Sequence, residues 1–360
     1  VGTDYVLFYV QGPVSWKYDN TRSRFVHTRN TYSNYGYYFL SDDTGTLLSP
    51  ATGEAVTGTP TEVTTYPMIQ VQDKDSINLV DRTGQSGGGK TFYGEQFGAG
   101  KKRTFRFSVP DATGGNSVFI DLAAYASTTS VFTAKLNNAT SKSVSINAAG
   151  GNYTFGVTNT ISMTGSANTT ETVELTFQNG STSALGWLNY IEITSTRALK
   201  MHGDYMPVRT LVNRNSSVPV RFHLTGAGAD VQIWDITDLA AITRMPATTD
   251  NNELLWTGTQ ADGVHEYIAV NTTGTQFVHA EVVGAVPNQN LHALSDIDYV
   301  IICPEGYEAQ SIRLAQAHEA KEAITWTVVT DQQVYNEFSS GTPDATAYRW
   351  LMKMLYDRAN

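Results

Sequence analysis

Short apolar, aromatic and β-branched runs, each broken by Gly, Asn or Ser, follow one another along most of the chain. Between Thr61 and Ser195 no stretch has a helical pattern. The predicted strands lie at 66–71, 103–109, 117–125, 130–135, 143–146, 172–177 and 188–194. Many short strands of similar length, joined by turns, are typical of a β-sandwich or jelly roll. We therefore assign residues 61–199 to a jelly-roll domain.

The same pattern continues on both sides of this domain. Within residues 1–60 we predict hairpins from strands at 4–10, 25–27 and 35–40. A second, smaller sandwich is predicted over residues 200–293, with strands at 218–224, 231–234, 254–258, 266–270 and 277–283. The N-terminal hairpins pack either with this second sandwich or with the jelly roll.

The pattern changes near the end of the chain, where strand and helix alternate. Residues 299–303 form a continuous apolar run that predicts a strand buried on both faces. A helix at 309–323 and a β-branched strand at 325–330 follow. Thr342 and Pro343 then predict the N-cap and the first residue of another helix. This βαβα order predicts a parallel strand pair.

Two strands do not make the larger sheet that such apolar parallel strands require. The chain ends at Asn360 before a third strand, so we expect residues 294–360 to be the first piece of a truncated α/β domain. Strands supplied by another chain are the alternative. The fold class predicted for the whole chain is mostly β, with jelly-roll and sandwich domains followed by this α/β segment.

Composition excludes several classes of function. The 360 residues are 41% hydrophobic and 16% charged, which fits a folded protein. A formal net charge of −10, without clustered Lys and Arg, argues against nucleic-acid binding. No apolar run is long enough to span a membrane. The single cysteine excludes an internal disulfide and a Cys-rich zinc site.

Few residues are candidates for catalysis. Cys303 lies in a predicted buried strand, which indicates a structural role, and nothing in the sequence places His318 beside it. The seven histidines show no metal-ligand spacing. We therefore assign no catalytic, cofactor-binding or metal-binding residue, and we expect no cofactor.

Two motifs resemble ligand-binding loops without their context. Residues 84–91 (GQSGGGKT) match the phosphate-loop pattern, but the glycines at 94, 98 and 100 disfavour the helix that must follow it. We expect no nucleotide binding. Residues 73–76 begin like a calcium loop but lack its glycine and closing glutamate.

A tyrosine-rich stretch has two interpretations. Tyr32, Tyr35, Tyr37 and Tyr38 could stack on sugars or could be half-buried packing residues of strands. We favour packing, because tyrosine is common in strands.

Several segments together carry a family resemblance. They are residues 8–13 (FYVQGP) with Trp16 and Tyr18, 32–35 (YSNY) before 37–39 (YYF), 92–97 (FYGEQF), 187–191 (WLNYI), 231–238 (VQIWDITD), 288–292 (NQNLH) before 298–302 (DYVII), and 334–338 (VYNEF) with Gly341. In order and spacing the chain resembles the gingipain-like cysteine peptidases, and within them the signal peptidase or sortase of the type IX secretion system of Bacteroidetes. It departs from the family pattern at Phe92, where tryptophan is usual, and in the Gly-rich run before it.

The resemblance implies a β-rich N-terminal region followed by a caspase-like α/β peptidase domain. It also implies that the catalytic His and Cys lie beyond this segment, so that Cys303 is not the nucleophile and this chain is inactive. The activity implied for the family is removal of a C-terminal secretion signal from exported proteins, in some members with transfer to a cell-surface lipopolysaccharide. Exported cargo proteins and other secretion-system components are the implied partners, and the implied location is secreted or outer-membrane-associated, facing the cell surface.

Two hypotheses of function follow. In the first, the chain is the non-catalytic N-terminal region of such a peptidase or sortase and positions the peptidase domain or its cargo. In the second, it is a free-standing carbohydrate-binding or adhesion module. An unfinished parallel sheet has no use in a binding module, which favours the first.

Overall fold

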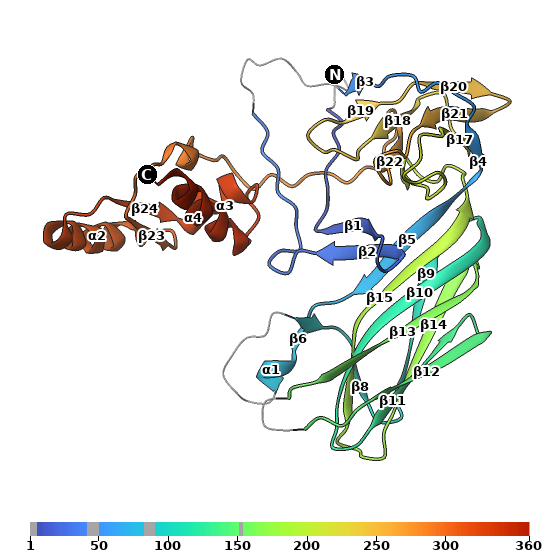
Figure 1. Ribbon diagram of the computed structural model, residues 1–360, viewed down its shortest axis with the longest axis horizontal. Helices are drawn as coiled ribbons and strands as arrows, with labels where there is room; N and C mark the ends of the chain where they lie inside the picture. The colour runs from blue at the N-terminus through green and yellow to red at the C-terminus, as the bar shows by residue number, and fades with distance from the viewer. Residues whose placement is uncertain (1–5, 42–49, 83–90, 151–153, 360) are drawn as a thin grey trace. The chain divides into compact units, whose positions relative to one another are not determined.

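The computed structural model describes residues 6–41, 50–82, 91–150 and 154–359 (Figure 1). The chain divides into two compact units. One comprises Val1–Trp16, His27–Leu47 and His279–Asn360, and the other comprises Lys17–Val26 and Leu48–Val278. Sheets dominate, so the predicted mostly-β fold with a C-terminal α/β segment is confirmed.

Two antiparallel sheets form the jelly roll. The first has the order β13-β10-β15-β5 and comprises β5 (Thr65–Asp73), β10 (Ala112–Tyr125), β13 (Val157–Ser166) and β15 (Leu185–Ala198). The second has the order β12-β11-β14-β9 and comprises β9 (Lys102–Ser108), β11 (Ser130–Leu136), β12 (Thr140–Ile146) and β14 (Thr170–Gln178). Shorter elements beside them are β6 (Ile77–Asn78), α1 (Leu79–Arg82), β7 (Phe92–Tyr93) and β8 (Gln96–Gly98).

The inner faces of these two sheets form one apolar core. On the first sheet Ile120 lies beside Ile161 and Ile191, and their exposed fractions are 0%, 1% and 0%. On the second sheet the rings of Phe132 and Phe177 are 4.8 Å apart and fully buried. Alternate residues along each strand therefore point into the core, as the period-two geometry of a strand requires.

The carboxylate of Glu171 on β14 is fully buried in this core. Its Oε2 accepts hydrogen bonds from the side-chain amides of Asn116 and Asn137, the former at 2.8 Å. Its Oε1 accepts from the Ser195 hydroxyl at 3.0 Å and from the Asn168 amide at 3.2 Å. Asn116 and Ser195 belong to the opposite sheet, so this carboxylate joins the two sheets by hydrogen bonds.

The second sandwich also consists of two sheets. One has the order β16-β22-β18-β19-β3, with β3 (Ala51–Thr52), β16 (Tyr205–Val208), β18 (Val231–Asp235), β19 (Thr243–Arg244) and β22 (Tyr267–Asn271). The other has the order β20-β21-β17-β4, with β4 (Thr61–Val63), β17 (Val220–Thr225), β20 (Ala247–Asp250) and β21 (Glu253–Gly258). Its core contains Phe222 stacked on Trp256, with ring centroids 4.6 Å apart.

The strand pairings bear on the predicted domain ranges at two places. Thr61–Val63 lie inside the range 61–199 predicted for the jelly roll, yet β4 pairs in parallel with β17 of the second sandwich. Residues 51–52, from the predicted hairpin region, pair with β19 of the same sandwich. The remaining limits of the ranges 1–60, 61–199, 200–293 and 294–360 stay predictions.

Several strand predictions are wrong. Residues 6–10, 35–40 and 277–283 are not in strands, and Val282 is 89% exposed. A strand needs a neighbouring strand to satisfy its backbone groups, and the sheets of the described residues do not include these segments. An N-terminal hairpin joins β1 (Val14–Asp19) to β2 (Arg24–Arg29). Strand β13 was not predicted from the sequence, because its outward residues are Thr, Asn and Ser, a composition that is typical of loops.

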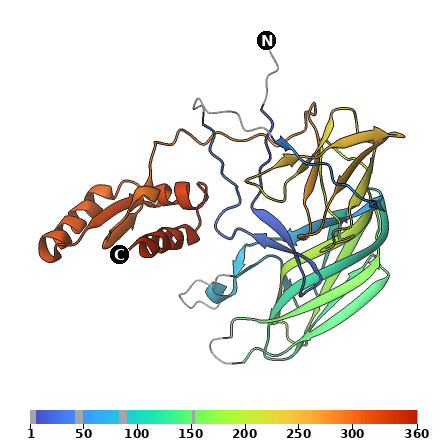
Figure 2. The ribbon, with the colours of Figure 1, turned by 45° about the horizontal axis from the view of Figure 1, so that its top comes forward.

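The C-terminal segment contains the predicted parallel pair. Strands β23 (Tyr299–Cys303) and β24 (Trp326–Thr330) pair in parallel, connected by α2 (Glu308–Glu322). The segment begins with the short 3₁₀ helix η1 (Leu291–Ala293). Figure 2 shows α2 and the C-terminal helix α4 (Thr346–Arg358) on either side of the two strands.

One helix of this segment was not predicted, and another begins late. Helix α3 (Asp331–Phe338) directly follows β24, and a capping box between Thr330 and Gln333 starts it. Thr342 and Pro343 do not begin a helix, because α4 starts after Ala345. The order is therefore βαβαα, and Val334, Leu351 and Leu355 form a small core with Val329 of the sheet.

Replacing Glu171 by alanine is expected to destabilise the jelly roll by about 3–5 kcal/mol, because the buried amides and hydroxyl that donate to it lose their acceptor. Glu174→Ala is the matched control. It lies on the same strand, faces outward and pairs with Lys102 at 2.9 Å, so its loss should cost at most about 1 kcal/mol. Urea denaturation measures both. Equal costs for the two variants would contradict the role given to Glu171.

The second sandwich is expected to lose stability at alkaline pH through His265. Its Nδ1 lies 2.7 Å from Asp235 and its Nε2 lies 2.8 Å from Asp262. The hydrogen bond to Asp235, aided by Asp262, raises the pKa of His265 from 6.5 to about 9 against the opposing effect of burial. Because the pKa of His265 is higher in the folded state than in the unfolded state, the stabilisation is complete below pH 6.5 and disappears as the pH rises through about 9.

Thermal unfolding at pH values on both sides of this window tests the effect. His265→Gln should show a smaller fall in melting temperature between the two pH values than the parent chain. His279→Gln, an exposed histidine outside the sandwich, should behave like the parent. An unchanged pH dependence in His265→Gln would rule out the assignment.

Candidate functional site

The carboxyl ends of the two parallel strands are the expected position of a site in an α/β segment. They are occupied by Cys303 and Thr330, which lie opposite each other in the register of β23 and β24. Cys303 is 5% exposed, in agreement with the buried strand position predicted for it. His318 lies on α2 against the ring of Tyr299, with centroids 5.1 Å apart, and its Nδ1 is 3.9 Å from Glu322. The structure records no contact between Cys303 and His318 in the part of the chain that it describes.

A carboxylate on α3 holds the chain that leads into this segment. Glu337 Oε1 accepts from the Gln289 side-chain amide at 2.8 Å and from the Leu291 backbone amide at 2.6 Å. Its Oε2 accepts from the His292 backbone amide at 2.9 Å and lies 2.6 Å from His292 Nδ1. We call Gln289, Leu291, His292 and Glu337 the linker latch.

Two further contacts support the linker latch. The His292 ring stacks on Phe338, with centroids 4.5 Å apart and planes 18° apart. Arg358 at the end of α4 donates to the carbonyl oxygens of His292 and Leu294. Burial alone would raise the pKa of Glu337, but hydrogen bonds from Leu291, Gln289 and His292 outweigh it and lower that pKa. The carboxylate therefore stays ionised at neutral pH.

The linker latch brings together two of the segments that carry the family resemblance, 288–292 and 334–338. Both segments are recognisable in the sequence, but the sequence analysis did not predict that they contact each other. The sequence does contain one signal for this contact. The capping box of Thr330 and Gln333 predicts a helix directly after β24, and Glu337 lies on that helix.

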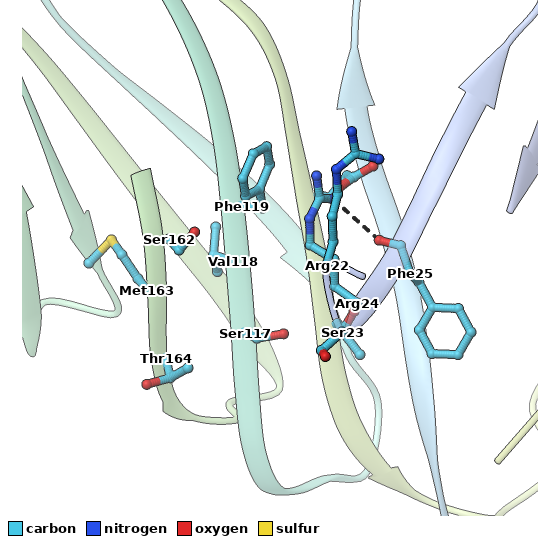
Figure 3. A pocket seen from close by; sticks show the side chains of 12 residues that line it. Arg22, Ser23, Arg24, Phe25, Ser117, Val118, Phe119, Ser162, Met163 and Thr164 are labelled. Carbon is cyan, nitrogen blue, oxygen red and sulfur yellow. Dashed lines mark hydrogen bonds and ion pairs between the residues drawn. The ribbon is translucent and has the colours of Figure 1, made fainter. Parts of the chain in front are cut away.

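A second candidate site lies on the outer face of the jelly roll. The turn between β1 and β2 lies against this face beside β15, and a recess of about 260 Å³ is lined by the turn region and by β10, β13 and β15 (Figure 3). This hairpin recess is lined by residues 22–23 of the turn, residues 24–25 at the start of β2, and residues 117–119, 162–164, 192 and 194 of the jelly-roll strands.

Arg24 fixes the turn to the sheet. Its guanidinium carbon lies 3.7 Å from the centroid of the Phe119 ring, and the side chain forms an ion pair with Glu192, whose side chain is 4% exposed. The turn itself is closed by Asp19, which accepts hydrogen bonds from the backbone amides of Thr21 and Arg22. These hydrogen bonds lower the pKa of the Asp19 carboxyl.

The remaining motifs form no site. Of the phosphate-loop match, residues 84–90 lie outside the described residues, and Thr91 is followed by β7 and β8 where the motif needs a helix. Among the described residues no group of His, Cys, Asp and Glu is arranged to hold a metal ion. None of the described helices combines the length and apolar character needed to cross a membrane.

The packing interpretation of the tyrosines is wrong for three of them. Tyr32, Tyr35 and Tyr38 are 49%, 68% and 49% exposed, because the strands expected to bury them do not form. Tyr37 is half-buried and lies near Gly341 in the loop after α3. The Tyr37 Cβ is 3.4 Å from the position that a Cβ atom would take if Gly341 had one.

Comparisons with known proteins agree with the family resemblance. Residues 292–360 match Peptidase family C25. The structure of dimeric latent PorU from Porphyromonas gingivalis is similar over 98% of this chain, with a TM-score of 0.84 and 26% sequence identity. The chain spans 33% of the length of that PorU chain. The resemblance to the gingipain-like peptidases, and within them to the type IX secretion signal peptidase, is therefore confirmed.

Two other solved structures are much less similar. The Cry4Aa toxin from Bacillus thuringiensis matches 28% of this chain and 18% of its own length at 14% identity, with a TM-score of 0.22. TmCBM61 in complex with β-1,4-galactotriose matches 36% of this chain and 86% of its own length at 8% identity, also with a TM-score of 0.22. Such scores support no conclusion. No curated protein matches the chain.

Glu337→Gln is expected to release the linker latch, because a neutral amide accepts more weakly than a carboxylate and its NH₂ group faces the donors. The backbone amides of Leu291 and His292 should exchange with solvent about 10–100 times faster. Hydrogen exchange measured by NMR checks this. Glu305→Gln makes the same change of charge at an exposed position of the same segment and should leave both amides protected. Unchanged protection in Glu337→Gln would show that the latch is not needed.

Proposed function

We propose that this chain is the non-catalytic N-terminal region of a secreted gingipain-like cysteine peptidase or sortase that processes the C-terminal secretion signals of exported proteins. The observation that carries the proposal is the similarity to PorU over 98% of the chain, together with the family C25 match at residues 292–360. In this proposal the protein is secreted or associated with the outer membrane and acts at the cell surface. Its partners are exported cargo proteins and other components of the secretion system.

The role proposed for this region is to position the peptidase domain or its cargo. The linker latch supports it, because Glu337 and Arg358 hold the chain at residues 289–294 in one geometry where it enters the family C25 segment. A pre-organised attachment lowers the entropy cost of presenting cargo to a peptidase. Cys303 supports the non-catalytic part, because a thiol that is 5% exposed in a paired strand does not reach a substrate.

The chain is expected to bind a reporter protein that ends in a C-terminal secretion signal without cleaving it. Biolayer interferometry measures the binding, and mass spectrometry of the reporter measures cleavage. The same reporter without its signal is the control and should not bind. Cleavage that disappears in Cys303→Ser would overturn the non-catalytic assignment, and equal binding of the two reporters would overturn the positioning role.

A further inference from the structure

The hairpin recess has a floor of hydroxyl groups at regular spacing. Ser117 on β10 lies opposite Thr164 on β13 and opposite Thr194 on β15. These three side chains form a row across adjacent strands, about 4.8 Å apart. Ser162 lies in the next row beside Phe119, and Ser23 of the turn also lines the recess (Figure 3).

These hydroxyls are free to bind a ligand. None of the side chains of Ser23, Ser117, Ser162, Thr164 and Thr194 forms a hydrogen bond with another group in the part of the chain that the structure describes. Each hydroxyl donates one hydrogen bond and accepts others, so the recess offers both kinds of partner. A ligand with several hydroxyl groups of its own would satisfy such a surface.

Charge balance excludes an anion as the preferred ligand. The recess contains two guanidinium groups, but Arg22 pairs with Asp19 at 2.7 Å and Arg24 pairs with Glu192. Each of these two guanidinium groups therefore has a carboxylate beside it, and the side chains that line the recess carry no uncompensated charge to attract a sulfate, phosphate or uronic acid. The ligand that fits this balance is uncharged.

The recess is also formed before a ligand arrives. Arg24 is held by the Phe119 ring and by Glu192, and Asp19 closes the turn by accepting from the Thr21 and Arg22 amides. The turn is thus fixed to the sheet by contacts of its own. A pre-formed recess lowers the ordering cost of binding.

We propose that the hairpin recess binds a neutral carbohydrate, with the hydroxyl row of Thr164, Ser117 and Thr194 as its floor. The recess, at about 260 Å³, suits a small part of a glycan and not a long chain bound along its length. This binding is separate from the peptidase role proposed above and does not depend on it. In this proposal the jelly roll binds the glycan, and the α/β segment has the peptidase-related role.

A glycan array that contains neutral and acidic oligosaccharides tests the proposal with the whole chain, followed by titration of the strongest ligand by calorimetry. Binding of neutral oligosaccharides is expected. The double variant Thr164→Val and Thr194→Val keeps the shape of the floor but removes two hydroxyls, so the affinity should fall about tenfold or more.

The matched control is the double variant Thr104→Val and Thr176→Val, which removes two outward hydroxyls from the other sheet of the jelly roll. It should bind like the parent chain, and circular dichroism should show the same fold for all three proteins. Absence of binding to any glycan, binding of acidic glycans only, or an equal loss in both double variants would each overturn the proposal.

Discussion

Burial of one face of every sheet is the constraint on which the rest of this structure depends. In the jelly roll Ile120, Ile161 and Ile191 lie side by side on one inner face, opposite the Phe132 and Phe177 rings of the other sheet. In the second sandwich Phe222, Trp256 and Tyr267 form the corresponding apolar core. Because side chains alternate along a strand, this burial directs every second residue outward. The outward-facing residues do not contribute to the core, and some of them, such as Phe119 and Glu192, bind the β1–β2 hairpin instead.

Three shielded carboxylates lie where separate elements meet. Glu171 joins the two sheets of the jelly roll, Glu192 holds the β1–β2 turn through Arg24, and Glu337 holds the linker against α3. A carboxylate removed from water is costly unless hydrogen bonds or an opposite charge compensate it. Such a group tolerates few alternative arrangements of its partners. Each carboxylate therefore stabilises one geometry of the joint, which apolar contacts alone specify less strictly.

These joints have different consequences for function. The joint at Glu337 belongs to the segment that matches Peptidase family C25, and it determines how the chain enters that segment. The joint at Glu192 contributes to a recess on the jelly roll, because the turn that it holds lies against a polar sheet face. One chain thus combines a β-rich region with a fixed outer surface and an α/β segment that is similar to a known peptidase family.

The sequence alone determined the fold class, most of the jelly-roll strands, the parallel pair β23–β24 and the family resemblance, because these depend on local composition, on residue order and on the spacing of recognisable segments. It failed at residues 35–40 and 277–283, where strand-forming side chains find no neighbouring strand, and at β13, whose outward face is polar. Only the tertiary structure decided which residues meet. Glu337 is 45 residues from His292, and Arg24 is far in sequence from both Phe119 and Glu192. Such pairs leave no local pattern, because strand register and turn geometry bring them together, and both the linker latch and the hairpin recess depend on them.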